Sequence, residues 1–333
     1  MIWQRVMLAV SSADNVPSAL LDRVGRIARG LQAEVDLFHC LYEPDIVQPR
    51  PHGAPVDAVI AARVDERHRS LERLADTLRA QGLKAHASVR WDYPMYEGII
   101  RQVLRHKPDL LILSAARTPD VSSRTLTYRE ARLIEECPCP LLLLKTPEVY
   151  SKGCVVAAVD PMHAYEVPEE LDEAIIAAAK TMAHALADAP VHVYHAVAPS
   201  PQSASGTPAA GSVQPPHDSG YQLARRATAA ARVRELASLH NISGARVRVE
   251  TGNVESALPD FAREVHADIV VMGAVSRTYP ERARFGHTAE KVLDAVHCDV
   301  LVVKPQGFQT PVSPDASPAA PQPPMEPRPA IPE

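Results

Sequence analysis

The sequence predicts an α/β protein made of two tandem doubly wound units, each with a five-stranded parallel sheet. Short apolar runs alternate with longer amphipathic stretches along the chain, as strands and helices do in such folds. The pattern occurs twice, because the apolar run at residues 6–10 returns at residues 155–159 and the same order of elements follows each run. The length of 333 residues also suits two domains better than one.

The first expected strand of each half leads into an amphipathic helix, and this alternation continues to a fifth strand. In the first half the helix is opened by Pro17 and closed by Gly30, residue types favoured at those positions. The expected strands are residues 6–10, 35–39, 85–89, 109–113 and 141–145, then 155–159, 191–195, 245–249, 268–272 and 300–304. The expected helices are residues 17–30, 57–81 and 96–105, then 168–187, 221–240, 256–265 and 291–296. A repeat of this length indicates a domain duplication rather than a solenoid.

The composition argues against several classes of protein. The formal net charge of −5 argues against a general nucleic-acid binder. No apolar run approaches the length of a membrane span, and the first residues lack a signal-peptide pattern, so we expect a cytoplasmic protein. The five cysteines are odd in number and form no framework of spacings, which fits a reducing compartment.

Residues 267–305 carry the most informative motif, which we interpret as a strand, a loop, a helix and a strand. Gly273 follows the first apolar run, Ser276 stands within the loop, and Gly286 precedes the helix. Backbone N–H groups at such a helix start, together with the helix dipole, favour an anion. The spacing resembles the signature of nucleotide-binding universal stress proteins: glycine, two residues, glycine, nine residues, glycine, then serine or threonine. Here Ser276 takes the second glycine place and His287 the hydroxyl place, with Thr288 one residue later.

The resemblance covers residues 2–305. Over this range the chain is similar to the tandem, two-domain members of the universal stress protein family. It implies a strand order of 3-2-1-4-5 in each half. We expect a first domain at residues 1–148 and a second at residues 149–305. Residues 306–333 are rich in proline and have no apolar period, so we expect a disordered tail.

With this strand order, a ligand binds between strands 1 and 4, outside their carboxyl ends. In the second half these two strands end at Asp160 and Gly273. The resemblance implies that Asp160 contacts a ribose or a metal ion. It also implies that the phosphate loop is lined by Gly273, Ser276, Gly286, His287 and Thr288. Arg277 adds positive charge beside this loop.

A purely structural interpretation of the same residues stays open. Gly273 can simply allow a strand and a helix to pack closely, and Asp160 can be a turn residue before Pro161. Ser276 narrows the path of a phosphate where the signature has glycine. The first half lacks these features, since Ser11 and Ser114 stand in the places of Asp160 and Gly273, so we expect a degenerate first domain.

Other motifs give weaker candidates. His39 and His195 occupy the same place in the two halves, and we expect hydrogen-bonded strand-end residues there, with a paired ligand site as the alternative. Cys137 and Cys139 form a C-x-C motif without a second pair at metal spacing, so no metal site is expected. The Walker and nucleophile-elbow patterns are absent, which favours a binding protein without catalytic residues over an enzyme.

We therefore expect a tandem universal stress protein with a role in survival under stress, whose second domain weakly binds ATP with Mg or a related nucleotide. The alternative is a family member that binds no nucleotide and acts as a structural or partner-binding module, or takes an apolar small molecule. Self-association or binding of a protein partner is compatible with either of these two functions. The expected last strands, residues 141–144 and 300–303, are too apolar for an exposed sheet edge, so we expect the halves to join there.

Overall fold

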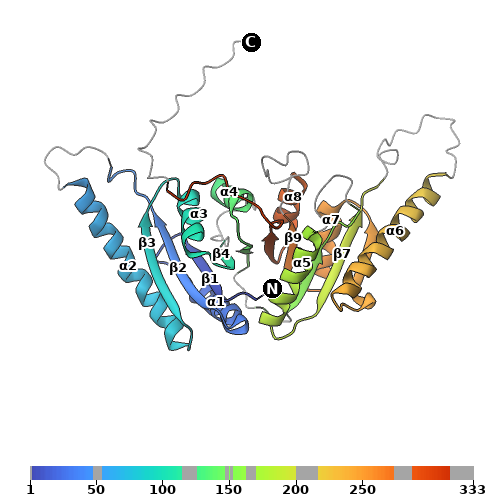
Figure 1. Cartoon of the computed structure of the whole chain (residues 1–333), viewed down its shortest axis with the longest axis horizontal. Coiled ribbons are helices and arrows are strands. Elements are labelled where there is room, and N and C mark those ends of the chain that lie inside the picture. Colours follow the sequence, from blue (N-terminus) through green and yellow to red (C-terminus); the bar gives the residue numbers. More distant parts are fainter. Residues whose placement is uncertain are drawn as a thin grey trace, which may run out of the picture.

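The computed structural model describes residues 2–47, 55–114, 126–146, 150, 153–162, 170–199, 217–273 and 287–315 (Figure 1). The first half contains β1 (Arg5–Val10), α1 (Ser18–Leu31), β2 (Glu34–Leu41), α2 (Val56–Ala80), β3 (Ala85–Trp91), α3 (Met95–His106), β4 (Leu110–Ser114), α4 (Tyr128–Glu136) and β5 (Leu141–Leu144). The second half contains β6 (Cys154–Ala158), α5 (Glu170–Ala185), β7 (Val191–Val197), α6 (His217–Leu239), the 3-10 turn η2 (Gly244–Arg246), β8 (Val247–Thr251), α7 (Val254–Glu264), β9 (Ala267–Gly273), α8 (His287–Ala295) and β10 (Asp299–Val303).

All ten strands form one sheet, in the order β3-β2-β1-β4-β5-β10-β9-β6-β7-β8. Within each half the strands follow the expected order 3-2-1-4-5, and their pairing is parallel. The two halves join through β5 and β10, which pair antiparallel with Leu142 opposite Leu301. The expected junction is therefore confirmed, and it merges the two five-stranded sheets into one.

Helices cover both faces of this sheet, so the strands are buried on both sides and consist of apolar runs. One core lies between the sheet and α1, α2, α5 and α6, and it includes Leu21 of α1 and Ile176 of α5. The other core lies between the sheet and α3, α4, α7 and α8, and it includes Ile100 of α3 and Phe261 of α7. Each core contains residues of both halves, so the junction is packed on both faces of the sheet.

Close packing of α1 against α5 reinforces the junction near the middle of the molecule (Figure 1). Gly30 allows this approach, because a Cβ atom at this position would lie 2.1 Å from the backbone oxygen of Ala185. A side chain at residue 30 would therefore push the two helices apart.

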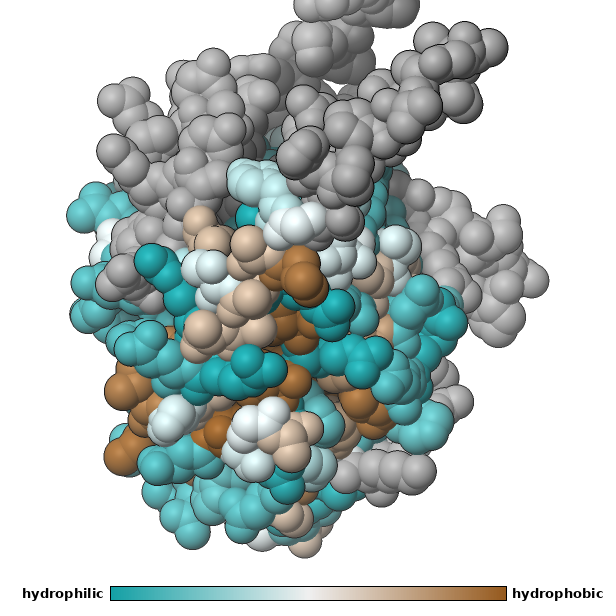
Figure 2. Space-filling view, turned by 90° about the vertical axis from the view of Figure 1, so that its right-hand side faces the viewer, coloured by the Kyte–Doolittle hydropathy of each residue, from teal (hydrophilic) through white to brown (hydrophobic). Residues whose placement is uncertain are grey.

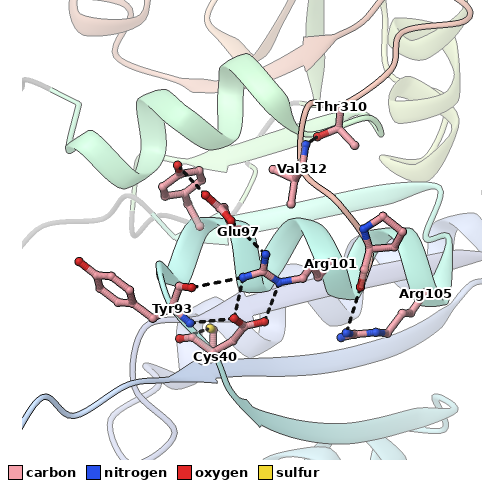
Figure 3. A network of polar contacts seen from close by, with 10 residues as sticks. Cys40, Tyr93, Glu97, Arg101, Arg105, Thr310 and Val312 are labelled. Atoms are coloured by element: carbon pink, nitrogen blue, oxygen red, sulfur yellow. Dashed lines mark hydrogen bonds and ion pairs between the residues drawn. The ribbon is translucent and has the colours of Figure 1, made fainter. Parts of the chain in front are cut away.

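The residues directly after β10 correct the expected start of the disordered tail. This segment crosses to the first half and runs past α3 and α4 (Figure 1). Val312 is 8% exposed and packs in the core that contains α3, and Arg105 Nη2 donates to the backbone oxygen of Pro314 at 3.4 Å (Figure 3). Residues 306–315 thus lie on the folded surface, because a single buried valine anchors a stretch without apolar periodicity. Residues 316–333 are outside the described part of the chain.

One further element was not identified from the sequence, the helix α4. It begins with a capping box, in which Glu130 N donates to Thr127 Oγ1 at 3.3 Å and Thr127 N donates to Glu130 Oε2 at 2.8 Å. In the second half, η2 precedes the third strand, which therefore begins at Val247 instead of Ala245.

Candidate functional site

The candidate site lies at the carboxyl ends of β6 and β9, two neighbouring strands of the second half. Their pairing places Ala158 opposite Met272, so Val159 and Gly273 follow at the same level. Asp160 is the next residue. The structure thus brings Asp160 and Gly273 to adjacent strand ends, at the point where the strand order of this half reverses.

Asp160 is held through its backbone. Its N–H donates to Asp172 Oδ1 of α5 at 2.9 Å. Its side chain is 32% exposed, and Oδ1 lies 3.8 Å from Nδ1 of His195. That separation is too long for a hydrogen bond but brings the carboxylate close to the imidazole. The carboxylate is therefore a partly exposed acceptor on a backbone that Asp172 holds in place.

His195 is buried in the neighbouring strand β7, two residues before its end, and its ring is oriented by the backbone. Its Nδ1 lies 3.0 Å from the carbonyl oxygen of Val159, so we assign the proton to Nδ1, which donates to that oxygen. His39 does the same in the first half, where its Nδ1 lies 3.1 Å from the carbonyl oxygen of Val10. Burial lowers the pKa of His39, which favours the neutral ring. The expectation of hydrogen-bonded histidines is confirmed, but each histidine lies two residues before the end of its strand, because β2 and β7 continue to Leu41 and Val197.

The space beside Gly273 is filled by α5. A Cβ atom on Gly273 would lie 2.9 Å from Cδ2 of Leu171 and 3.5 Å from Cδ1 of Ile175. The glycine thus permits the helix to approach β9 closely, which agrees with the structural interpretation of this residue. Leu171 and Asp172 were missed from the sequence, since nothing in the helix pattern indicates which of its residues face the strand ends.

The loop that resembles a phosphate-binding loop falls largely outside the described residues. Ser276, Arg277 and Gly286 lie in the undescribed stretch 274–286. His287 is described by its backbone as the first residue of α8, and Thr288, the second, is exposed. The N-terminus of α8 therefore follows the end of β9 through this loop, as expected for a β-loop-α unit.

The first half differs at the equivalent strand ends. β1 and β4 pair with Ala9 opposite Leu113, so Val10 and Ser114 follow at the same level. Ser11 is exposed in the place of Asp160. The carboxyl edge of the first-half sheet therefore has a histidine equivalent to His195, but it has no carboxylate equivalent to that of Asp160.

Two hollows on the surface lie away from these strand ends. A hollow of about 680 Å³ in the first half is bordered by Arg5, Glu34, Lys84 and Lys107, near the amino ends of β1 and β2. Another, of about 230 Å³, is bordered by Arg263, His266, Asp268 and His297 near the amino end of β9. Among the described residues, no group of three or more His, Cys, Asp or Glu side chains could hold a metal ion.

The order of elements, the repeated strand order and the paired histidines near the strand ends define a duplicated, doubly wound α/β protein. The model of the universal stress protein family matches residues 3–145 and again residues 158–304. The chain therefore belongs to the universal stress protein family, as a stress-related tandem member with two copies of the family domain.

Curated relatives share this tandem organisation over almost their whole length. Universal stress protein E of Photorhabdus laumondii is 24% identical over 316 residues, which are 93% of this chain and 98% of the relative. Universal stress protein E of Escherichia coli K12 is 27% identical over 293 residues, 87% of this chain and 89% of the relative.

Solved structures agree with the fold of the chain. A protein of unknown function from Pseudomonas aeruginosa PAO1 superposes with a TM-score of 0.64 and 26% identity, covering 91% of this chain and 93% of its own. A universal stress protein from Archaeoglobus fulgidus gives a TM-score of 0.61 at 15% identity, covering 90% of this chain and 98% of its own. In the described part of the chain, no helix has the length and apolar character needed to cross a membrane.

Proposed function

We propose that the second half binds a nucleotide at the carboxyl ends of β6 and β9, and that this binding serves the stress role of the protein. The position of Asp160 carries the proposal. Its carboxylate is 32% exposed at the point where the strand order reverses, while its backbone is fixed by Asp172. In open parallel sheets, ligands bind at this point.

In this proposal each part of the site has its own task. Asp160 accepts hydrogen bonds from ribose hydroxyl groups or holds Mg that accompanies ATP. The phosphates lie against the loop that contains Ser276, Arg277 and Gly286 and against the start of α8 at His287 and Thr288. Backbone N–H groups at a helix N-terminus suit an anion, and Arg277 adds a positive charge.

The described residues fit the ribose side of such a ligand, because a carboxylate is a good acceptor for hydroxyl groups. Gly273 contributes differently from the expectation. Its missing side chain makes room for Leu171, so contact with phosphate falls to the loop that follows. With Ser276 in place of a glycine, we propose weak binding.

Calorimetric titration of the full chain with Mg-ATP tests the proposal. Asp160→Asn keeps the backbone N–H but removes the charge, and a hydrogen bond to a charged group contributes about 1.5–3 kcal/mol, so affinity should fall about 10-fold or more. Ser11→Ala is the matched control at the first-half position and should leave affinity unchanged. Ser276→Gly should strengthen binding. Absence of binding by both the unmodified chain and Ser276→Gly would reject the nucleotide.

A second candidate function is a partner-binding module without a nucleotide, formed by the same fold. The contact of Leu171 with Gly273 favours it, since this glycine is already accounted for by packing. An apolar ligand is a further form of this alternative, although the outer face of the second half mixes hydrophilic and hydrophobic residues (Figure 2). Native mass spectrometry of freshly purified protein separates these cases by the mass of any bound molecule.

We also propose a cytoplasmic location and no catalytic activity. All five cysteines are free thiols, as is usual in a reducing compartment. Self-association or a protein partner remains compatible with both candidate functions, and analytical ultracentrifugation measures it directly.

A further inference from the structure

Two thiols lie in contact where α4 ends and β5 begins. Cys137 is the residue that ends the helix, with its N–H donating to the carbonyl oxygen of Leu133 at 2.9 Å. Cys139 follows after one proline, and its Sγ lies 3.6 Å from Sγ of Cys137. Cys137 is fully buried, whereas Cys139 is partly exposed. Of the two residues, Cys139 is thus the one that has exposure to solvent.

The other three cysteines lack these features. In the described part of the chain, Cys40, Cys154 and Cys298 are free thiols that make no hydrogen bond with another cysteine sulfur. Burial raises the pKa of Cys40 and of Cys298 to about 12 and that of Cys154 to about 11. Since the thiolate is the reactive form, these three thiols are unreactive at neutral pH.

The buried side chain of Lys304, next to β10, places a positive charge near the two thiols. Nζ of Lys304, the residue after this strand, donates to the carbonyl oxygen of Glu135 at 2.9 Å, so its charge lies at the negative end of α4. A hydrogen bond from Cys139 lowers the pKa of Cys137, and the charge of Lys304 lowers it further. The same hydrogen bond raises the pKa of Cys139, so Cys137 is the thiol of the pair that ionises more readily. The other charged groups acting on Lys304 are Glu135 and Glu136.

We propose that Cys137 and Cys139 are a redox site, which forms a reversible disulfide when a peroxide reaches Cys139. The contact between the two sulfurs carries this assignment. The two cysteines are separated by one residue in the chain and their sulfurs are 3.6 Å apart, so no distant segment has to approach for a disulfide to form. The site is separate from the strand ends discussed above and does not depend on nucleotide binding.

Hydrogen peroxide oxidises the two thiols to a disulfide in two steps. The Cys137 thiolate takes the proton of Cys139 across their contact, and the Cys139 sulfur attacks one oxygen of hydrogen peroxide. The O–O bond breaks, and the leaving hydroxide takes a proton to become water. The sulfur of Cys137 then attacks the sulfenic acid on Cys139, the S–O bond breaks, and the second hydroxide takes the thiol proton as water. Two thiols lose two electrons and the peroxide gains them. A dithiol reductant reverses the process by thiol–disulfide exchange.

The place of the pair links it to the segment after β10. Cys137 lies in the same apolar core as Val312, and Nζ of Lys304 lies 4.6 Å from the centre of the Phe308 ring. Disulfide formation removes the thiolate that balances Lys304. Oxidation therefore changes the surroundings of the residues that carry the segment 306–315 onto the first half.

Mass spectrometry of the full chain tests the proposal. The reduced protein is treated with a small excess of hydrogen peroxide, remaining thiols are alkylated, and the protein is digested with trypsin. The peptide of residues 133–145 contains both thiols. It should escape alkylation and be about 2 Da lighter than its reduced form, and dithiothreitol should restore it. Peptides containing Cys40, Cys154 and Cys298 should be alkylated as in untreated protein.

Four variants sharpen the test, with circular dichroism as the check of folding. Cys139→Ser should abolish the light peptide, whereas Cys298→Ser should leave it unchanged. Lys304→Met should move the pH profile of the oxidation rate to higher pH, because the thiolate loses its cation, and Lys304→Arg should restore it. The proposal fails if peptide 133–145 of the unmodified protein remains fully alkylated, or if the two thiols become separate sulfinic acids without a disulfide.

Discussion

Arg23 of α1 and Asp299 of β10 form an ion pair across the junction, with side chains 1% and 0% exposed. Asp299 also accepts from the hydroxyl group of Tyr150 at 2.8 Å and from the backbone N–H of Lys145 at 2.8 Å. Arg23 also donates to the carbonyl oxygen of Thr146, and its guanidinium lies 4.6 Å from the centre of the Tyr150 ring. A residue of the first half thus neutralises a carboxylate that the second half has buried.

Arg23→Met should lower the free energy of unfolding by about 3–5 kcal/mol, because it leaves the Asp299 carboxylate buried without its partner. Burial already raises the pKa of Asp299 despite the attraction of Arg23, which shows how costly the charge is at this place. Urea denaturation measures the change. Arg29→Met, on the same helix but exposed, should change stability by less than about 0.5 kcal/mol. Equal effects of the two changes would mean that the buried pair contributes no more than a surface contact.

Gly30→Ala should destabilise the protein by about 1–3 kcal/mol through overpacking, since the new methyl group meets the backbone oxygen of Ala185. Gly220→Ala is the matched control within a helix, because nothing lies within 4 Å of a Cβ atom there. That change should stabilise the protein by about 0.5–1 kcal/mol. Thermal unfolding would refute the close contact of α1 and α5 if Gly30→Ala were neutral.

The lowered pKa of Lys304 predicts that the stability of the protein depends on pH. Burial lowers its pKa from 10.5 to about 8 in the folded protein. Between these values the unfolded chain binds more protons, so this group makes stability rise with pH across about pH 8 to 10.5. The stability of the unmodified protein minus that of Lys304→Met should therefore increase by up to about 3 kcal/mol over this window. Denaturation at several pH values gives the difference, and a flat difference would contradict the lowered pKa.

Removal of residues 306–333 should lower the melting temperature by several degrees, because it exposes the core around Val312, whose burial contributes about 1.5 kcal/mol or more. Removal of residues 316–333 alone keeps every described contact of this segment and should leave the melting temperature within error. Differential scanning calorimetry of both truncations separates the two parts. A similar loss from each truncation would place the stabilising contacts beyond residue 315.

The apolar repeats predicted the strands and the junction, whereas the strand order within each half was implied by the resemblance to the universal stress protein family. The four consecutive leucines of β5 are too apolar for a strand at an exposed sheet edge. Pairing with β10 covers this edge. The sequence did not reveal α4, although Thr127 and Glu130 have the spacing of a capping box. Leu171 could not be identified from periodicity, because its contact with Gly273 depends on how a helix lies across the sheet. Val312 was missed for a similar reason, since one apolar residue among prolines gives no pattern.

Because β5 and β10 belong to one chain, their antiparallel pairing joins the two halves independently of protein concentration. Two separate subunits of this size would come apart on dilution and could exchange with other partners. Within one chain each half always meets the same neighbour in a one-to-one ratio. The two carboxyl edges can therefore change independently, so that one half can lose a carboxylate, as at Ser11, while Asp160 is kept in the other.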